Sequence, residues 1–357
     1  MNSVFTKSAS IYIGAFLFLA GTSCKKEKST PDWHNQDRSH EKSSLTTPLA
    51  RSTTSPDTSY KKTKTPAPGS TASLRFLSYN LKNYLTQPYI EKEKVKQPVK
   101  KQAEITHLVE IIAAAKPDIL GLCEINTKAD VLDLQQRLKT SGIHLPYHHL
   151  THGVDPVRSL AFLSRHPLIN KQQYSIEDYS IEGRSFKISR GILDITVQLP
   201  LDGPDSTTEV QHTSIRFIGS HLKSKRPSPY ADQALMRRHE SILVRQYIDT
   251  ILQNSPDTKL IVYGDLNDSR RSQAVSTIRG KHNTPTGLKI LELADSRGDK
   301  WTYHWNQEDI YSRFDYLMYS KNLSSSVNKA DSKILDPHNW RAASDHRPLL
   351  LLLNLEY

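Results

Sequence analysis

The segment Lys259-Leu-Ile-Val-Tyr-Gly-Asp-Leu-Asn267 joins a run of apolar residues to a short polar motif. A short apolar run that ends at a turn residue is typical of a buried strand, which we place at 259–263. On the extended segment that follows, alternate side chains point to opposite faces. Asp265 and Asn267 therefore project together while Leu266 turns toward the core, and the segment predicts a strand that delivers a carboxylate and an amide to one point.

Three more apolar segments end beside residues that are costly to place near a core. Asn80 ends the first predicted strand, Glu124 lies near the end of the second, and Asp345 and His346 precede the last. In α/β sheets, active sites gather at strand ends, where loops converge on a rigid scaffold. One such residue is usually part of an ordinary turn, but four strand ends of this kind in one chain indicate a common site.

The remaining sequence alternates helical and strand patterns. Apolar spacing predicts helices over 99–115, 128–140 and 232–252, and the apolar face of the third includes Leu235. Short apolar runs between Gly, Pro, Asp or Ser predict strands at 74–81, 119–125, 160–164, 192–199, 215–220, 259–263, 312–320 and 349–353. This order predicts an α/β domain in which two packed sheets carry helices on their outer faces.

The N-terminal part differs in composition from the rest. A positive charge precedes the apolar run 11–20, which is typical of an export signal and too short for a membrane span of roughly 20 residues. The segment after it is rich in Ser, Thr, Pro and Lys and poor in large apolar side chains, so we expect disorder. We predict a signal peptide at 1–23, a disordered tether at 24–72 and one domain at 73–357.

Cys24 is the expected lipid attachment site, because small residues followed by Cys resemble a bacterial lipoprotein signal. We expect an exported protein that is anchored to the membrane through this lipid and faces the periplasm or the cell exterior. Cleavage by an ordinary signal peptidase is the alternative and would give a periplasmic or secreted protein. The other cysteine, Cys123, lies in an apolar run, and we assign it to core packing.

Charge limits the choice of partners. The chain carries a formal net charge of +11, but part of this excess lies in residues 1–72, so the domain is only mildly basic. Such an excess favours phosphate-bearing substrates. It lacks the concentrated basic stripe of a dedicated nucleic-acid binder. We expect a monomer whose substrate is a phosphoester, with nucleic acid included in that class.

Six short motifs follow one another along the domain. They are Ser78-Tyr-Asn-Leu81, Leu122-Cys-Glu124, Gly219-Ser-His-Leu-Lys-Ser224, Gly264-Asp-Leu-Asn267, Ser312-Arg-Phe-Asp-Tyr-Leu317 and Ser344-Asp-His-Arg-Pro348. In this order they resemble the endonuclease/exonuclease/phosphatase superfamily, also called the deoxyribonuclease-I-like fold. The resemblance covers about residues 74–356 and implies a four-layer α/β sandwich of two mixed β-sheets flanked by helices. It also implies divalent-metal-dependent hydrolysis of phosphoester bonds by attack of water.

The resemblance assigns roles to the strand-end residues. Glu124 is the expected principal ligand of Mg²⁺ or Mn²⁺, with Asn80 and Asp345 near or on the metal. Carboxylate and amide oxygens are ligands that Mg²⁺ prefers. Asp265 and Asn267 are expected to hold and polarise the attacking water and a phosphoryl oxygen.

His346, oriented by Asp315, is expected to act as general base or as a cationic stabiliser of developing charge. The resemblance leaves the division of roles between His346 and Asp265 open. His221 is expected to donate a hydrogen bond to a phosphate oxygen. Some family members carry an Asp two residues after the strand-end Asn, where this chain has Lys82, which argues against a carboxylate ligand on the first strand.

Four basic residues are candidates for contacts with substrate phosphate, and solvated surface positions are the alternative for each: Arg158, Arg190, Lys223 and Lys225. The leading function is that of a phosphodiesterase or nuclease. Sphingomyelinase-like or inositol-phosphate phosphatase activity would use the same catalytic set. A catalytically silent binding lipoprotein is an alternative from another class, and it predicts the loss of at least one catalytic residue, whereas all are present.

Overall fold

The computed structural model describes residues 72–91, 93–98, 100–173, 178–201 and 211–355. The predicted signal peptide, Cys24 and the predicted tether up to residue 71 lie outside these ranges. No helix within the described ranges is long and apolar enough to cross a membrane.

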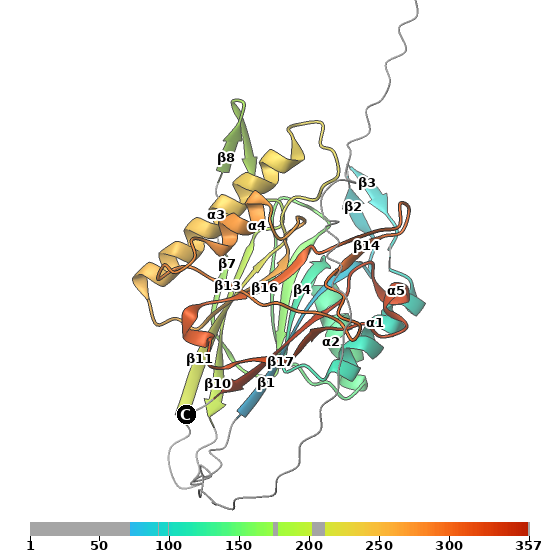
Figure 1. Cartoon of the computed structure of the whole chain (residues 1–357). Coiled ribbons are helices and arrows are strands. Elements are labelled where there is room, and N and C mark those ends of the chain that lie inside the picture. Colours follow the sequence, from blue (N-terminus) through green and yellow to red (C-terminus); the bar gives the residue numbers. More distant parts are fainter. Residues whose placement is uncertain (1–71, 92, 99, 174–177, 202–210, 356–357) are drawn as a thin grey trace, which may run out of the picture. The chain divides into compact units, whose positions relative to one another are not determined.

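Two mixed β-sheets form the centre of the described domain (Figure 1). The first runs in the order β17 (Val327–Ile334), β18 (Leu349–Leu355), β1 (Ala72–Tyr84), β4 (Ile119–Ile125), β6 (Ser159–Ser164), β5 (Tyr147–Thr151). The second runs in the order β13 (Lys289–Ile290), β16 (Asp315–Tyr319), β12 (Leu260–Asp265), β11 (Gln211–Ser220), β10 (Ile192–Leu201), β7 (Leu168–Gln173). Smaller pairs are β2 (Tyr89–Glu91) with β3 (Lys94–Lys96), β8 (Asp178–Ile181) with β9 (Arg184–Lys187), and β14 (Tyr303–Trp305) with β15 (Ile310–Ser312).

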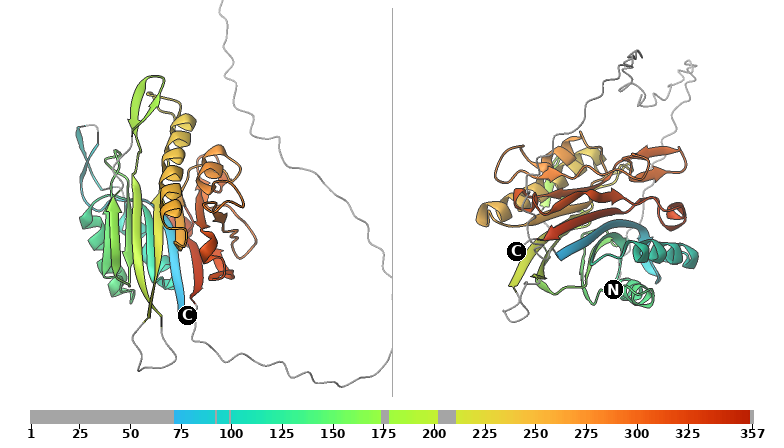
Figure 2. Two further views of the ribbon diagram at one scale, coloured as in Figure 1. Left: turned by 90° about the vertical axis from the view of Figure 1, so that its left-hand side faces the viewer. Right: turned by 60° about the horizontal axis from the view of Figure 1, so that its bottom comes forward.

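Helices cover the outer faces of both sheets (Figures 1 and 2). The helices are α1 (Gln102–Ala115), α2 (Lys128–Thr140), α3 (Gln233–Asn254), α4 (Gln273–Arg279), α5 (Trp340–Ala343) and the 3₁₀ turn Lys321–Leu323. Apolar residues of α1 and α2 pack on the first sheet, and those of α3 and α4 pack on the second. Side chains of α2 and α3 cap these helices, since Thr127 accepts from Asp130 N–H and Asp232 accepts from Ala234 N–H.

The layer between the sheets is apolar. The Phe76 ring lies 5.0 Å from that of Phe217 and 5.1 Å from that of Tyr263, measured between centroids. Cys123 packs in the same layer and is 1% exposed, as its assignment to the core predicted. The order helix, sheet, sheet, helix confirms the predicted four-layer α/β sandwich.

The predicted elements are present, with three differences. The strand expected at 312–320 is two strands, because the buried Thr302 hydroxyl accepts the N–H groups of Phe314 and Asp315, at 3.0 Å each, where one strand would continue. The prediction for Leu235 was wrong: it is 38% exposed, and charged residues of α3 occupy part of the buried face instead. Edge strands β5, β7 and β17 were not predicted, because their sequences are largely polar. The shorter elements were not predicted either: α4, α5, β2, β3, β8, β9, β13 and β14.

Strand direction brings the predicted site residues to one edge of each sheet. β1 is parallel to β4, and β11 is parallel to β12, so the carboxyl ends of each pair lie together. The antiparallel neighbours β18, β6, β10 and β16 therefore begin at the same edges. In this register Asp265 lies directly opposite Asp315.

Gly264 allows β12 to enter the site. Its φ is +130°, a conformation that favours glycine, and a Cβ atom at this position would lie 2.0 Å from the carbonyl oxygen of Ser220. The glycine in the motif therefore permits the end of β12 to approach the end of β11.

Candidate active site

Asp265 is the buried centre of the site, with an exposed fraction of 2%. Its Oδ2 atom lies 3.6 Å from Nε2 of His346 and 3.6 Å from Nε2 of His221. The same oxygen accepts a hydrogen bond from Nδ2 of Asn80 at 3.0 Å. Oδ1 accepts the N–H of Asn267 at 2.9 Å. Residues from both sheets therefore meet at one carboxylate.

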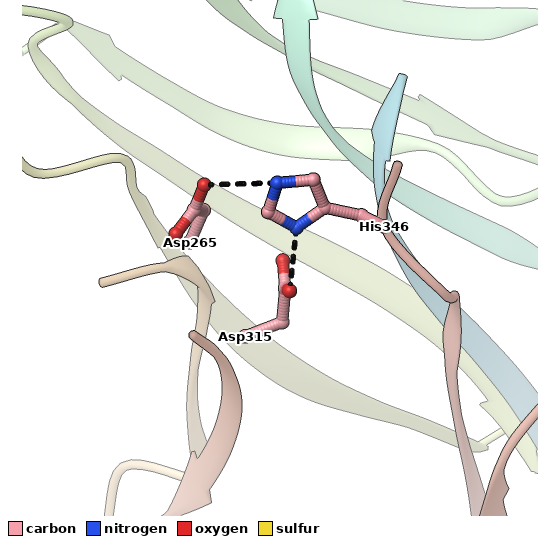
Figure 3. Close-up of side chains that lie close together, drawn as sticks. All are labelled: Asp265, Asp315 and His346. Carbon is pink, nitrogen blue, oxygen red and sulfur yellow. Dashed lines mark hydrogen bonds and ion pairs between the residues drawn. The ribbon is translucent and has the colours of Figure 1, made fainter. Parts of the chain in front are cut away.

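His346 lies between two carboxylates (Figure 3). Its Nδ1 atom is 2.7 Å from Oδ2 of Asp315, and Nε2 faces Asp265. Burial by itself would lower the pKa of His346, but the charges of Asp315 and Asp265 outweigh burial and raise it. The imidazole is therefore stabilised as a cation, and its ring is oriented by Asp315 as the sequence predicts.

Negative charge is crowded around Asp265. Burial, the carboxylate of Asp315 and that of Glu124 raise the pKa of Asp265, although His346 and the N–H of Asn267 oppose the shift. A cation placed among these carboxylates would relieve their repulsion.

Glu124 faces both the centre and a basic residue. Oε1 lies 3.4 Å from Nδ2 of Asn80 and 4.0 Å from Nε2 of His221. Oε2 accepts the N–H of Asn83 at 3.0 Å and lies 3.8 Å from Nε of Arg158. Glu124 has a φ of +65°, an uncommon conformation for a residue with a side chain. Its carboxylate is thus held beside Asp265 at the cost of backbone strain.

The Asn80 amide has a defined orientation. Its Oδ1 atom accepts the N–H of Lys82 at 3.0 Å, so Nδ2 points to Glu124 and Asp265. In this orientation Asn80 holds the two carboxylates together. A role as a metal ligand, which stays a prediction, would require the amide to rotate and to lose its contact with Lys82.

The site residues fit a hard divalent cation. Among the described residues, potential ligand atoms of Asp265, Asp315 and His346 lie within 4.8 Å of one another. This set differs from the predicted ligands Glu124, Asn80 and Asp345. Because Nδ1 of His346 is hydrogen-bonded to Asp315 and the ring favours its protonated form, the carboxylate oxygens are better donors to a metal than the imidazole.

His221 is electrostatically different from His346. It is 2% exposed, and burial together with Arg190, His346 and Arg158 lowers its pKa, so the ring is neutral near pH 7. Its Nδ1 atom is buried without a hydrogen-bond partner among the described residues. A neutral imidazole can donate one N–H to a phosphoryl oxygen.

The predicted basic residues occupy unequal positions. Arg158 is the nearest to the carboxylates through its contact with Glu124. Arg190 is 6% exposed and donates to the carbonyl of Leu222 at 3.3 Å. Lys225 is exposed, and its Nζ atom lies 3.3 Å from Oδ1 of Asp268. Lys223 is partly buried, and burial lowers its pKa.

Asp155 and Glu240, which were not predicted, lie around the site, as does Tyr303. Asp155 lies 3.2 Å from Nε of Arg190 and 3.5 Å from a terminal nitrogen of Arg158. The ring of Tyr303 lies 4.8 Å from that of His346. Glu240, on α3, is fully buried. Glu240 shares the buried face of α3 with Arg237, Ser241 and Arg245, so the apolar spacing of this helix carries no signal that could have identified it.

Asp345 and Asn267 also lie beside the centre. Asp345 is partly exposed, and its charge contributes to raising the pKa of His346. Asn267 donates from Nδ2 to the carbonyl of Leu222 at 3.0 Å. Their proposed roles with metal and water stay predictions.

Comparison with known proteins identifies the fold and the family. No curated protein matches the chain in sequence. The fold is similar to that of an endonuclease/exonuclease/phosphatase family protein from Bacteroides thetaiotaomicron, with 14% identity and a TM-score of 0.52 over 81% of this chain and 97% of that one. It is also similar to that of the endonuclease/exonuclease/phosphatase from Bacteroides vulgatus, with 15% identity and a TM-score of 0.50 over 80% of this chain and 100% of that one. The human Nocturnin catalytic domain with bound sulfate anion is also similar (18%, 0.50, 79% and 94%). The sequence model of the family described as "Endonuclease/Exonuclease/phosphatase family" matches residues 77–346. The chain belongs to the endonuclease/exonuclease/phosphatase family.

Proposed function

We propose that the protein hydrolyses phosphodiester bonds in a reaction that depends on Mg²⁺ or Mn²⁺. The observation that carries this proposal is the buried Asp265 carboxylate, which lies 3.6 Å from the imidazoles of both His346 and His221. Family membership supports phosphoester hydrolysis in general, because members are generally hydrolases of phosphoesters and are typically dependent on a divalent metal.

The chain's own residues supply the proton transfer and the binding of phosphate oxygens. Asp265, whose pKa is raised, accepts the proton of the attacking water, while cationic His346 stabilises negative charge that develops on the phosphoryl oxygens. Neutral His221 donates an N–H to one of these oxygens. Glu124 and neighbouring carboxylates would hold the cation, which when bound supplies positive charge to the non-bridging oxygens.

A substrate panel tests the proposal. The purified protein is assayed with bis-p-nitrophenyl phosphate, plasmid DNA, RNA, sphingomyelin and inositol phosphates, each with Mg²⁺, Mn²⁺ or EDTA. We expect diester hydrolysis that EDTA abolishes and that is lost in Asp265→Ala and His346→Ala. Activity that survives EDTA or either substitution would contradict the mechanism.

We also propose that the protein is exported and anchored through a lipid on Cys24. The apolar run that precedes Cys24 and the small residues beside it support the proposal. Mass spectrometry of the mature N-terminus is the test. A lipid-modified Cys24 is expected, and an unmodified Cys24 or cleavage beyond it would contradict anchoring.

A further inference from the structure

Glu240 is a buried acid without a part in the proposed chemistry. It is 0% exposed and lies on α3. Oε1 accepts the N–H of Ser189 at 2.9 Å and its hydroxyl at 2.5 Å, and Oε2 accepts the N–H of Lys223 at 2.5 Å. An ionised carboxylate only accepts hydrogen bonds, so these three donors suit the charged form. Burial raises the pKa of Glu240, and the hydrogen bonds and the charge of Arg190 oppose that rise.

Arg237 lies one turn before Glu240 and contacts the same loop. It is 3% exposed and donates from a terminal nitrogen to the carbonyl of Lys223 at 3.1 Å. Its Nε atom donates to Oδ2 of Asp268 at 3.0 Å. Glu240 and Arg237 thus hold Lys223 at its N–H and at its carbonyl, respectively.

The contacts of Glu240 continue to the basic residues. The carbonyl of Ser189 accepts the N–H of Asp155 at 2.8 Å. The Asp155 carboxylate in turn lies within ion-pair distance of Arg190 and Arg158. Through Ser189, Glu240 therefore influences the placement of both guanidinium groups.

The other contact of Glu240 continues to the segment after β11 that carries His221. Lys223 is two residues beyond His221, and the intervening Leu222 donates its N–H to the carbonyl of Asp265 at 3.0 Å. The carbonyl of Leu222 accepts from both Arg190 and Asn267. These contacts hold Leu222, and with it His221, against Asp265, and the hydrogen bond from Lys223 N–H to Glu240 holds the next residue of the same segment.

We infer that Glu240 is a positioning residue that fixes the Ser189 loop against the His221–Lys223 loop, so that their cationic and N–H donors face one substrate phosphate. The inference rests on the proposed phosphoester hydrolysis. Glu240 acts through its partners, because all hydrogen bonds of its side chain with described residues go to Ser189 and Lys223. Its loss should weaken binding of phosphate more than it slows the chemical step.

Glu240→Gln is the main test, made in the full chain. The variant replaces one carboxylate oxygen by an NH₂ group, which donates hydrogen bonds. The glutamine can therefore accept from Ser189 or from Lys223, but not from both. We expect the dissociation constant of inorganic phosphate, measured by titration calorimetry with Mg²⁺ present, to rise about tenfold. The KM for bis-p-nitrophenyl phosphate should rise similarly, while kcat changes less than about threefold.

Ser241→Ala is the matched control. Ser241 is the next residue of α3, is 0% exposed, and donates its hydroxyl to the carbonyl of Arg238 at 2.6 Å. This variant should leave phosphate affinity and KM unchanged. Ser189→Ala removes the hydroxyl that donates to Glu240 and leaves the N–H of residue 189 in place. The double variant with Glu240→Gln should bind phosphate no more weakly than Glu240→Gln, because both changes affect the contact between Ser189 and Glu240.

The outcomes are distinct. Phosphate affinity and KM within twofold of the original protein in Glu240→Gln would overturn the inference, even if the melting temperature fell. Strictly additive effects of the two substitutions, or no phosphate binding by the unaltered protein, would also overturn it. If Glu240→Gln does not fold, Ser189→Ala decides by the same criterion. Failure of the unaltered protein to hydrolyse any phosphoester refutes the proposed function instead, and the phosphate titration still decides the role of Glu240.

Discussion

At the scale of single residues, the contact between Asp315 and His346 determines how the imidazole is used. The 2.7 Å hydrogen bond fixes the ring and leaves Nε2 facing Asp265. Because both partners favour the imidazolium, His346 suits stabilisation of developing negative charge, and Asp265 is the better acceptor for a proton.

Replacing Asp315 tests this orientation. We expect Asp315→Asn to lower kcat for bis-p-nitrophenyl phosphate by about 10²- to 10⁴-fold, because an amide neither orients nor stabilises the protonated ring as a carboxylate does. Steady-state kinetics with Mg²⁺ is the measurement. Asp257→Asn, at an exposed acid, is the control and should retain full activity. A decrease below about threefold in Asp315→Asn would argue against the pairing.

Lys100 gives a prediction for the pH dependence of stability. This lysine is 6% exposed, and its Nζ atom donates to the carbonyls of Leu81 and Ala343 at 2.8 and 2.5 Å. Burial lowers the pKa of Lys100 to about 8 from 10.5. The folded state therefore loses this proton at lower pH than the unfolded state, and the contribution of Lys100 to stability rises between those two values.

Urea unfolding at pH 7 and pH 9.5 tests that sign. Relative to Lys100→Met, which cannot titrate, the original protein should gain about 2 kcal/mol in unfolding free energy between the two pH values. An equal change in both proteins would show that Lys100 is not the titrating group. Of the two partners, Leu81 directly follows Asn80 on β1, and Ala343 shortly precedes Asp345 and His346, so Lys100 also connects two parts of the candidate site.

At the scale of elements, the end of β12 depends on a close approach between strands. A Cβ atom at Gly264 would collide with the carbonyl of Ser220, and the positive φ is itself costly for other residues. We expect Gly264→Ala to lower the unfolding free energy by roughly 3 kcal/mol. Chemical denaturation is the measurement.

Gly142→Ala separates the two causes. Gly142 also has a positive φ, +84°, but nothing lies within 4 Å of the position its Cβ would take. This substitution should therefore cost only about 1 kcal/mol. Equal losses in the two variants would mean that contact with Ser220 is not important.

Helix α3 shows what an element-scale pattern can predict. Apolar spacing identified the helix, with Leu243, Ile248 and Ile251 buried as expected. The same pattern misplaced Leu235 and gave no sign of the buried Glu240. Hydropathy ranks charged residues as exposed, but α3 buries this one because backbone donors of two loops satisfy it.

At the scale of the molecule, the site joins the two sheets. Glu124 lies on the first sheet and Asp265 on the second, and Asn80 contacts both carboxylates. Because burial and repulsion from Asp315 and Glu124 raise the pKa of Asp265, a cation bound here should stabilise the folded state. Mg²⁺ at a hundred times its dissociation constant should add about 2.7 kcal/mol, seen as a higher melting temperature in calorimetry.

Glu124→Gln should raise stability without metal and reduce the stabilisation by Mg²⁺. Without metal this variant should melt at a higher temperature than the original protein, because one repelling charge is gone, and Mg²⁺ should raise its melting temperature much less. Glu308→Gln, at an exposed position, should respond to Mg²⁺ as the original protein does. If neither Mg²⁺ nor EDTA changes the melting temperature of the original protein, the result would contradict a metal site.

The sequence by itself determined the layered α/β class, the order of the main strands and the residues that stand at their ends. It could do so because burial imposes a local period on each element, and because turn residues mark where a strand stops. Only the tertiary structure decided which of these residues meet. Asn80 and Asp265 are 185 positions apart and join through the packing of two sheets. The same packing set the Asn80 amide toward the carboxylates and buried Glu240 behind the basic loops, since long-range contacts leave no period in a sequence.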